Sequence, residues 1–445
     1  MHWLFETFAG YGERLALCTG SETATYHQLL ERAGAWDREL ARRGIGPGQS
    51  VAFCGDYSVA TSALILALLA RGNIAVPLTV ATRDNHPLYL ELAETKALIE
   101  LDDGEHWRLS TRPDKPDAHP LLASLRAAER PGLVLFSSGS TGTPKAIVHD
   151  LEKLLAKIPR GKRAWRSLVF LLLDHIGGIN SLLRSLLNGG TAISIRDRAP
   201  DQVCAAIAAE RIELLPTSPT FLNMLLISRL YEKYDLSSLE LITYGTEVMP
   251  AATLRAVHRA LPKVRLKQTY GLSEFGIFST QSEGSESLWM RIGRGEVETK
   301  IVDGTLRVRG DTAMLGYLNA PSPFDAEGWF DTGDQVEARG DLVRILGRQS
   351  DVINVGGEKV YPAEVESVLL EMDNIRDVAV RGKKSPITGQ VVMVTVALHA
   401  PEDVAALKQR IWEHCSGRLT RNMVPAVVEV VQDLKVTDRF KKVRA

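Results

Sequence analysis

Apolar stretches of strand length alternate with helix-length segments through most of the first two thirds of the chain. The apolar runs "SVAFCG" (50–55) and "NIAVPL" (73–78) lie on either side of "VATSALILALLA" (59–70), and similar runs further along end in polar or Gly-rich turns. Near-continuous apolar strands separated by helices are typical of parallel sheets that are covered on both faces. The pattern therefore predicts a large α/β domain with helices flanking mainly parallel sheets.

The pattern changes at about Val297. The segment "ETKIVDGTLRVRGDTAMLGYLN" (298–319) alternates apolar and polar positions between turn residues, which predicts antiparallel strands and a small β-barrel-like part. The residues after "LGRQSD" (346–351) predict strands mixed with two helices, at 362–372 and 401–417, which is the make-up of a small α+β domain. We therefore expect an N-terminal domain at 1–348 and a C-terminal domain at 349–445.

Length and charge limit the classes of function. A chain of 445 residues is too long for one ordinary core, so at least two domains are expected. It carries 53 Lys and Arg residues against 54 Asp and Glu residues, and this balance provides no general field for nucleic acid or for an anionic membrane. Any anion must therefore be bound at a local site.

The cysteines and the N-terminus indicate in which cellular compartment the protein is expected. The cysteines lie far apart, without the spacing of a zinc site, and this favours a reduced, cytoplasmic protein. The start "MHWLFETFAGYGERLAL" (1–17) does not resemble a signal peptide. The apolar run 59–70 is shorter than the roughly twenty residues that a membrane span requires, so we expect a buried helix and no membrane span.

A turn-forming segment, "SSGSTGTPK" (137–145), follows the apolar run "LVLF" (133–136). Its glycines allow backbone N–H groups to face a ligand, and its hydroxyls and lysine add donors and positive charge, which suits a polyphosphate. A flexible linker is the alternative, although apolar residues fix both ends. The spacing is not that of a Walker A motif. The phosphate-binding candidates are Ser137, Ser138, Gly139, Ser140, Thr141, Gly142, Thr143 and Lys145.

Together with five later segments, this one forms an ordered pattern. The five are "TYGTEVMP" (243–250), "QTYGLSE" (268–274), "GWFDTGD" (328–334), "GRQSDVINVGGEKVYPAEVE" (347–366) and "RFKKVR" (439–444). The series resembles the successive signatures of the adenylate-forming superfamily, which includes acyl-CoA synthetases, aryl acid ligases, peptide-synthetase adenylation domains and luciferases. The resemblance covers nearly the whole chain, which is shorter than typical members before Leu133. It implies that the small C-terminal domain is mobile.

By resemblance, the 268–274 segment contacts the nucleotide and a metal ion. Tyr270 stacks on adenine, Ser273 (where the family usually has Thr) contacts the α-phosphate, and Glu274 helps to hold Mg²⁺. A hard cation that bridges phosphates takes one or two protein carboxylates, so a single glutamate is adequate. Taken alone, the segment would be an exposed turn. The resemblance adds Gly245, Thr246, Glu247, Thr269 and Gly271 to the nucleotide-binding positions.

Two charged residues match ribose contacts. Asp334 corresponds to the carboxylate that accepts both ribose hydroxyls, since two adjacent O–H donors suit one bidentate acceptor. Arg348 corresponds to a second ribose contact, and Asp351 to the hinge. Without the resemblance, Asp334 and Arg348 would be turn and surface charges. Both lie near the break in composition, where a hinge is expected.

The end of the chain, "VTDRFKKVRA" (436–445), resembles a family pattern of the form Thr-x-x-Gly-Lys-x-x-Arg, with Phe440 in place of Gly. Lys441 is therefore the candidate catalytic lysine, and Lys442 is the competing choice. A carboxylate that approaches the α-phosphate of ATP meets like charge, and an ammonium between them stabilises the charge that develops. Alternatively, the basic end of the chain could be solvated lysines only.

In "LLLDHIGGIN" (171–180), His175 matches a family position that gates the acyl pocket and aids the thioester step, although a histidine beside a buried strand is often only a core residue. Asp174 is a departure with no assigned role. The segment lacks the Phe-Asp pattern of amino-acid-activating members. A non-amino organic acid, fatty or aryl, is therefore the expected substrate.

In "INVGGEKVYP" (353–362), Gly356 and Gly357 match a loop that lines the tunnel for pantetheine, where glycines permit close approach of the backbone. Asn354 and Val355 replace the usual basic residue, which leaves open whether the acceptor is CoA or the phosphopantetheine of an acyl carrier protein. The resemblance thus implies an ATP- and Mg²⁺-dependent ligase that forms acyl-AMP and then a thioester. Transfer to an amine, amino-acid adenylation, luciferase-type oxidation and a non-catalytic nucleotide-binding relative remain alternatives.

Overall fold

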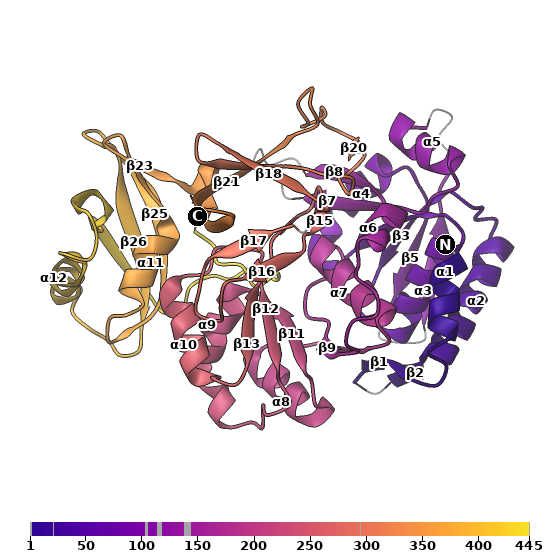
Figure 1. Ribbon diagram of the computed structural model, residues 1–445, viewed down its shortest axis with the longest axis horizontal. Coiled ribbons are helices and arrows are strands. Elements are labelled where there is room, and N and C mark those ends of the chain that lie inside the picture. Colours follow the sequence, from indigo (N-terminus) through magenta and orange to yellow (C-terminus); the bar gives the residue numbers. More distant parts are fainter. Residues whose placement is uncertain are drawn as a thin grey trace. The chain divides into compact units, whose positions relative to one another are not determined.

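The computed structural model describes residues 2–20, 22–102, 106–113, 118–137, 144–293 and 295–444. Contacts divide the chain into two compact units (Figure 1). The first unit comprises residues 1–216, 271–278 and 309–328, and the second comprises residues 217–270, 279–308 and 329–445. The predicted domain boundary after residue 348 falls within the second unit and does not coincide with the division into units. It therefore remains a prediction.

The first unit contains a sheet with the strand order β20-β8-β7-β4-β3-β5-β6. Its inner strands are parallel, with Val51 opposite Ala75 on one side and Ala97 on the other, whereas β8 and β6 pair antiparallel with their neighbours. The strands are β3 (Ser50–Cys54), β4 (Ile74–Leu78), β5 (Thr95–Leu101), β6 (Trp107–Thr111), β7 (Gly132–Ser137), β8 (Lys145–Asp150) and β20 (Gly316–Tyr317).

The same unit contains a second run of adjacent strands in the order β11-β9-β10-β1-β2, parallel except for the β1–β2 hairpin. These strands are β1 (Leu15–Thr19), β2 (Glu22–Thr25), β9 (Arg166–Leu168), β10 (Thr191–Ser194) and β11 (Leu214–Thr217), and β14 (Gly271–Leu272) pairs with β15 (Gly276–Ile277). The helices are α1 (His2–Ala9), α2 (Tyr26–Arg42), α3 (Val59–Ala70), η1 (Val80–Asn85), α4 (His86–Leu92), α5 (Pro120–Ala127), α6 (Leu151–Ala156), α7 (Ile176–Leu187) and α8 (Pro200–Glu210).

Helix α3 confirms the expectation of a buried helix. Ser58 caps its N-terminus by accepting a hydrogen bond from the Thr61 N–H at 3.0 Å. All of its residues except Ala60 and Ala70 are buried, as expected for a helix that is apolar on every face. None of the helices in the part of the chain that the structure describes is long and apolar enough to cross a membrane.

The apolar run 167–173 forms less strand than its sequence predicts. Strand β9 ends at Leu168, and Val169 donates one last ladder hydrogen bond to Ile193. The chain then turns beneath α7 so tightly that a Cβ at Gly178 would lie 2.0 Å from the Leu172 carbonyl oxygen. Phe170 and Leu173 are buried by packing and not by strand pairing, and periodicity alone does not distinguish these two kinds of burial.

The second unit contains the parallel pair β12 (Leu241–Tyr244) and β13 (Arg265–Gln268) with the helices α9 (Pro219–Ser228) and α10 (Ala251–Ala260) and the short η2 (Leu230–Glu232). Its second sheet has the order β16-β17-β22-β21-β19-β18. The predicted antiparallel strands are confirmed, and they begin earlier than expected, at β16. Their bounds are β16 (Thr280–Ser282), β17 (Met290–Ile292), β18 (Glu298–Val302), β19 (Thr305–Arg309), β21 (Phe330–Arg339) and β22 (Leu342–Arg348).

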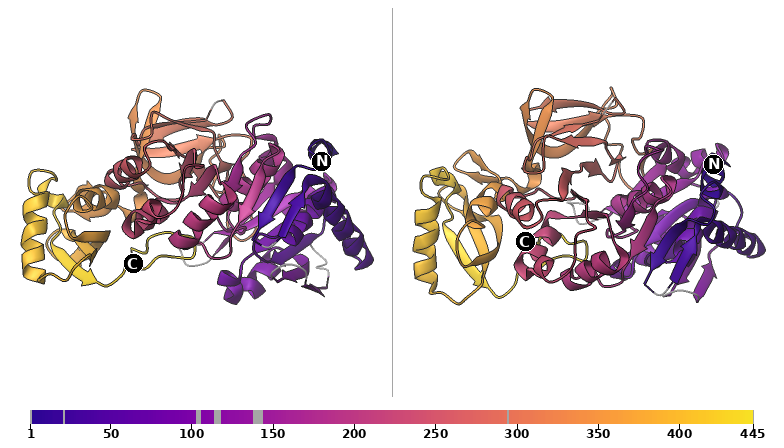
Figure 2. Two further views of the ribbon diagram at one scale, coloured as in Figure 1. Left: turned by 90° about the horizontal axis from the view of Figure 1, so that it is seen from below. Right: turned by 60° about the horizontal axis from the view of Figure 1, so that its bottom comes forward.

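The predicted α+β segment is also confirmed within this unit. Its sheet has the order β24-β23-β26-β25, and β27 pairs with β26. The elements are η3 (Gln349–Asp351), β23 (Ile353–Val355), β24 (Glu358–Val360), α11 (Pro362–Leu369), β25 (Ile375–Ser385), β26 (Gly389–Leu398), α12 (Val404–Cys415), η4 (Arg421–Met423) and β27 (Val427–Val431). After β27 the chain runs back towards its C-terminus as an extended segment (Figure 2). There the Ser218 hydroxyl, at the start of α9, donates to the Phe440 carbonyl oxygen at 2.7 Å.

Candidate active site

The lysine of the predicted phosphate loop lies beside the predicted metal ligand in the first unit. Lys145 begins β8 opposite Ser137, and Ser138, Gly139, Ser140, Thr141, Gly142 and Thr143 fall outside the described residues. The Lys145 ammonium lies 5.0 Å from the centre of the Tyr317 ring, and the Tyr317 hydroxyl donates to Glu274 Oε1 at 2.9 Å. Tyr317 thus contacts both groups, and no feature of its sequence neighbourhood predicted this.

The backbone of the 271–274 turn is fixed from two sides. His149 Nε2 lies 2.7 Å from the Ser273 carbonyl oxygen, and the Met314 N–H donates to the Glu274 carbonyl oxygen at 2.7 Å. Burial lowers the pKa of His149 to about 4, so this ring is neutral at pH 7 and donates from Nε2. Sequence reasoning missed His149 because a histidine within an apolar strand carries no distinctive signal.

The donor set suits a magnesium ion that is held mainly by phosphates. Glu274 supplies one half-buried carboxylate, oriented by Tyr317. Among the residues that the structure describes, no group of three or more His, Cys, Asp and Glu side chains could hold a metal by itself. One carboxylate with substrate oxygens and water is a common arrangement for Mg²⁺, so the fit is good.

In the second unit, the 245–247 and 269–270 segments lie against each other. Thr269 donates from its backbone N–H and its hydroxyl to the Tyr244 carbonyl oxygen, at 2.8 and 3.0 Å. A Cβ at Gly245 would lie 2.5 Å from Thr269 Oγ1, so only glycine fits. Thr246 adopts a left-handed φ of 73°, and Glu247 Oε1 accepts from the Thr220 N–H at 2.8 Å.

The two predicted ribose contacts lie together. Asp334 and Arg348 face each other across β21 and β22, with the Arg348 Nε 3.2 Å from Asp334 Oδ1. The Tyr270 hydroxyl donates to Asp334 Oδ2 at 2.7 Å. Burial raises the pKa of Asp334, while the charge of Arg348 and the hydrogen bond from Tyr270 oppose this rise. The structure thus brings three predicted nucleotide-binding residues together, with Tyr270 and Asp334 buried and Arg348 exposed.

The structure distinguishes the two candidate lysines. Burial lowers the pKa of Lys441, and the nearby Glu247 carboxylate opposes this effect, so the ammonium lies in the field of the predicted nucleotide-binding residues. The Lys442 ammonium instead forms an ion pair with Asp377 at 2.8 Å and donates to the Val378 carbonyl oxygen at 2.6 Å. Lys442 therefore has a structural partner, and the catalytic role of Lys441 remains a prediction.

Comparisons with known proteins agree with this geometry. A family model described as AMP-binding enzyme matches residues 4–318, and one described as AMP-binding enzyme C-terminal domain matches residues 364–441. The chain belongs to the AMP-binding enzyme family. It is a member of the adenylate-forming superfamily, as its motifs indicate, and it is a carboxylic acid adenylating ligase.

Relatives and structures align along this AMP-binding enzyme. The 2-succinylbenzoate–CoA ligase of Bacillus cytotoxicus is 26% identical over 467 residues, which are 97% of this chain and 95% of that protein. The indoleacetate–CoA ligase of Aromatoleum aromaticum is 29% identical over 345 residues, which are 69% of this chain and 65% of that protein. The anthranilate CoA ligase AuaEII, solved in complex with anthranoyl-AMP, has a TM-score of 0.83 at 21% identity and covers 99% of this chain and 95% of its own, which shows that the fold is shared.

His175 of this AMP-binding enzyme has a local structural role. It precedes α7, and its Nδ1 accepts a hydrogen bond from the Gly177 N–H at 3.0 Å, which caps the helix. The ring is half-buried, and its predicted gating role remains a prediction. Its neighbour Asp174 is buried and accepts a hydrogen bond from the Thr79 hydroxyl at 3.0 Å.

The predicted hinge and thiol loop lie on the surface of the second unit. Asp351 ends the short helix η3 and is exposed. Gly356 and Gly357 form the turn between β23 and β24, with φ of 62° and 93°. Two consecutive positive φ values are what a tight hairpin turn of the primed type requires, so backbone conformation alone explains both glycines. The Gly357 N–H donates to Asn354 Oδ1 at 2.9 Å.

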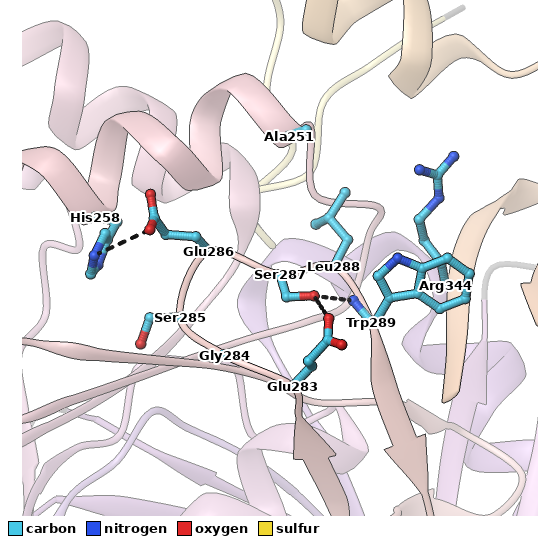
Figure 3. Close-up of a pocket in the computed structure, with 10 residues that line it drawn as sticks. All are labelled: Ala251, His258, Glu283, Gly284, Ser285, Glu286, Ser287, Leu288, Trp289 and Arg344. Carbon is cyan, nitrogen blue, oxygen red and sulfur yellow. Dashed lines mark hydrogen bonds and ion pairs between the residues drawn. The ribbon is translucent and has the colours of Figure 1, made fainter. Parts of the chain in front are cut away.

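A separate hollow of about 550 Å³ lies between α10 and the 283–289 loop (Figure 3). Its walls include an ion pair between His258 and Glu286 at 3.7 Å and a hydrogen bond from Ser287 to Glu283 at 2.7 Å. None of the site residues predicted from the sequence is among its described lining residues. The hollow is therefore distinct from the cluster of Tyr270, Asp334 and Arg348.

Proposed function

We propose that this AMP-binding enzyme activates a non-amino organic carboxylic acid, aryl or fatty, as its acyl-AMP and then transfers the acyl group to the thiol of CoA. The backbone contact of the neighbouring Lys442 N–H with Glu247 Oε2, at 3.4 Å, and the effect of the Glu247 and Asp334 charges on Lys441 support the assignment of Lys441 to the first step. The names of the relatives, which are CoA ligases of aryl-type acids, support the substrate class and the acceptor.

In the first half-reaction, a carboxylate oxygen of the substrate attacks the α-phosphorus of ATP. A bond forms between that oxygen and the phosphorus, the bond from the α-phosphorus to the bridging oxygen breaks, and pyrophosphate leaves. The Lys441 ammonium stabilises the negative charge that develops as two anions approach each other. When bound, Mg²⁺ neutralises phosphate charge, and Glu274 is the carboxylate that would hold it.

In the second half-reaction, the thiol releases its proton to solvent, its sulfur attacks the acyl carbonyl carbon, the bond from that carbon to the phosphate oxygen breaks, and AMP leaves. We propose that residues 349–445 rotate about Asp351 between the two half-reactions, which withdraws Lys441 and brings the Gly356–Gly357 turn to the reacting carbonyl. Rotation allows one pocket to serve two reactions in sequence. The exposed, tight turn at these glycines supports this role because a backbone without side chains permits close approach of the pantetheine arm.

The Lys441→Ala variant tests the proposal. It should abolish ATP–pyrophosphate exchange and retain thioester formation from supplied acyl-AMP and CoA, because only the first step needs the ammonium. Lys408→Ala, on the exposed face of α12, is the matched control and should change neither reaction. If Lys441→Ala exchanges pyrophosphate at nearly the wild-type rate, the assignment of Lys441 is wrong.

The acid and the acceptor are determined separately. Pyrophosphate exchange should be measured against a panel of fatty, aryl and amino acids, with the largest rates expected for an aryl or a fatty acid. The products formed with CoA, with an acyl carrier protein and with amines then identify the acceptor. Exchange with amino acids only would contradict the proposed substrate class, and an amide product in place of the thioester would contradict the proposed acceptor.

A further inference from the structure

Three buried polar side chains connect segments that are far apart in the second unit. The Lys442 ammonium and the Asn223 amide both contact Asp377 Oδ1, at 2.8 and 3.0 Å. Lys442 belongs to the C-terminal segment, Asp377 to β25 and Asn223 to α9. Only 6% of the Lys442 side chain is exposed, and Asn223 and Asp377 are buried as well.

The residues next to Lys441 are also bound to the 217–270 part of the unit. The Phe440 carbonyl oxygen accepts from the Ser218 hydroxyl at 2.7 Å, and the Phe440 ring packs edge-on against Phe221 with 5.7 Å between ring centres. The residues on both sides of Lys441 are therefore anchored, and these contacts fix the place from which its side chain extends.

The stability of the fold does not by itself explain why the buried ion pair between Lys442 and Asp377 is present. Transferring an ammonium and a carboxylate out of water is costly, and a well-packed apolar pair is often as stable. The best-attested advantage of such a pair is that it selects one arrangement among several. Here Asp377 is held at once by the C-terminal segment and by α9. Its contact with Asn223 exists only when β25 is docked on α9, and its contact with Lys442 holds the C-terminal segment at that place.

We propose that Lys442, Asp377 and Asn223 form a latch that selects the docked arrangement in which Lys441 is delivered to ATP. They are positioning residues for the first half-reaction, and the inference rests on the proposed function. The contact between Asn223 and Asp377 exists in only one of the two arrangements and shifts the equilibrium towards it by its own free energy, while the pair of Lys442 and Asp377 holds the residues next to Lys441 beside that contact. Weakening the latch therefore slows adenylation and spares the step that follows rotation.

The test uses Lys442→Met and the milder Asn223→Ala, with Lys408→Met as the matched control. For Lys442→Met, kcat of pyrophosphate exchange should fall ten- to a hundredfold with the KM for ATP within twofold. For Asn223→Ala it should fall three- to tenfold. Thioester formation from supplied acyl-AMP should stay within twofold of wild type in both variants. Lys442→Arg, which keeps the charge, should recover part of the exchange rate.

The latch proposal is wrong if the variants lose both half-reactions equally, or if neither variant loses pyrophosphate exchange. Hydrogen exchange of the free protein separates this result from a failure of the proposed function. If wild type exchanges pyrophosphate with no acid of the panel, the proposed function fails. In that case the latch proposal holds if the backbone amides of residues 435–444 exchange hydrogen at least tenfold faster in Lys442→Met than in wild type. It fails if the rate of this hydrogen exchange is unchanged.

Discussion

The ion pair between Arg444 and Glu366 provides a quantitative test of how the C-terminal segment is anchored. Arg444 Nε and Nη2 each donate to the Glu366 carboxylate at 2.9 Å, and Val380 N–H donates to it at 3.1 Å. The Glu366 side chain is 1% exposed, whereas the Arg444 side chain is 26% exposed. Removing Arg444 therefore leaves a buried charge without its partner, whereas removing the charge of Glu366 leaves a charge that reaches water.

Arg444→Met leaves a carboxylate buried without its main partner, which typically costs about 3–5 kcal/mol. Glu366→Gln leaves a guanidinium that reaches water, so the expected cost is the smaller one of a lost hydrogen bond to a charged group, about 1.5–3 kcal/mol. At about 1.4 kcal/mol per tenfold, Arg444→Met should speed hydrogen exchange of residues 435–444 about a hundredfold or more. Glu366→Gln should have a clearly smaller effect.

Acid pH provides a second measurement on the same pair. Burial alone would raise the pKa of Glu366, but the charges of Arg444 and Lys442 lower it overall. A carboxyl with a lowered pKa stabilises the folded state above its ordinary pKa of about 4.3, and the contribution is lost as pH falls through the folded-state value. The difference between wild type and Arg444→Met should therefore narrow as pH falls below about 5. A larger effect of Glu366→Gln than of Arg444→Met at pH 7 would refute this reasoning.

Two further substitutions test the nucleotide and metal contacts. Tyr317→Phe removes the hydroxyl that donates to Glu274 at 2.9 Å, and because a hydrogen bond to a charged group contributes about 1.5–3 kcal/mol, the Mg²⁺ concentration for half-maximal pyrophosphate exchange should rise about tenfold or more. An unchanged Mg²⁺ titration would contradict the role of Glu274. Gly245→Ala places a Cβ 2.5 Å from Thr269 Oγ1, so ATP binding measured by calorimetry should weaken about tenfold or more. Gly34→Ala in α2, where a Cβ makes only an ordinary contact at 3.6 Å, is the control and should bind ATP as wild type does.

The sequence predicted what depends on local chemistry and periodicity. The fully apolar segment 59–70 forms the buried helix α3, and the alternating segment after Val297 forms antiparallel strands. The motifs also placed Asp334 and Arg348 in one cluster, because both lie at matching positions of one hairpin. Such features need only the residues of one segment or of two neighbouring strands, which is the range over which patterns are informative.

Long-range side-chain contacts were not predictable in the same way. Tyr317 and Glu274 are 43 residues apart, Lys442 and Asp377 are 65 apart, and Asn223 and Asp377 are 154 apart. Each residue has an ordinary neighbourhood, and its partner is set by the packing of whole elements. For this reason the sequence left Lys441 and Lys442 as competing candidates, whereas the structure assigns Lys442 to Asp377.

Phe440 supports the placement of Lys441 by its backbone rather than its side chain. The family pattern has glycine here, and Phe440 adopts the left-handed φ of 50° that glycine takes without strain. This conformation costs an ordinary residue about 1–2 kcal/mol, so it persists only where other contacts compensate. The edge-on pair with Phe221 contributes about 0.5–1.5 kcal/mol beyond simple burial, which offsets most of the strain. The chain thus keeps a left-handed turn of the kind that glycine favours, and Lys441 follows that turn. The ring that stands in place of glycine adds an anchor where the C-terminal segment packs on α9.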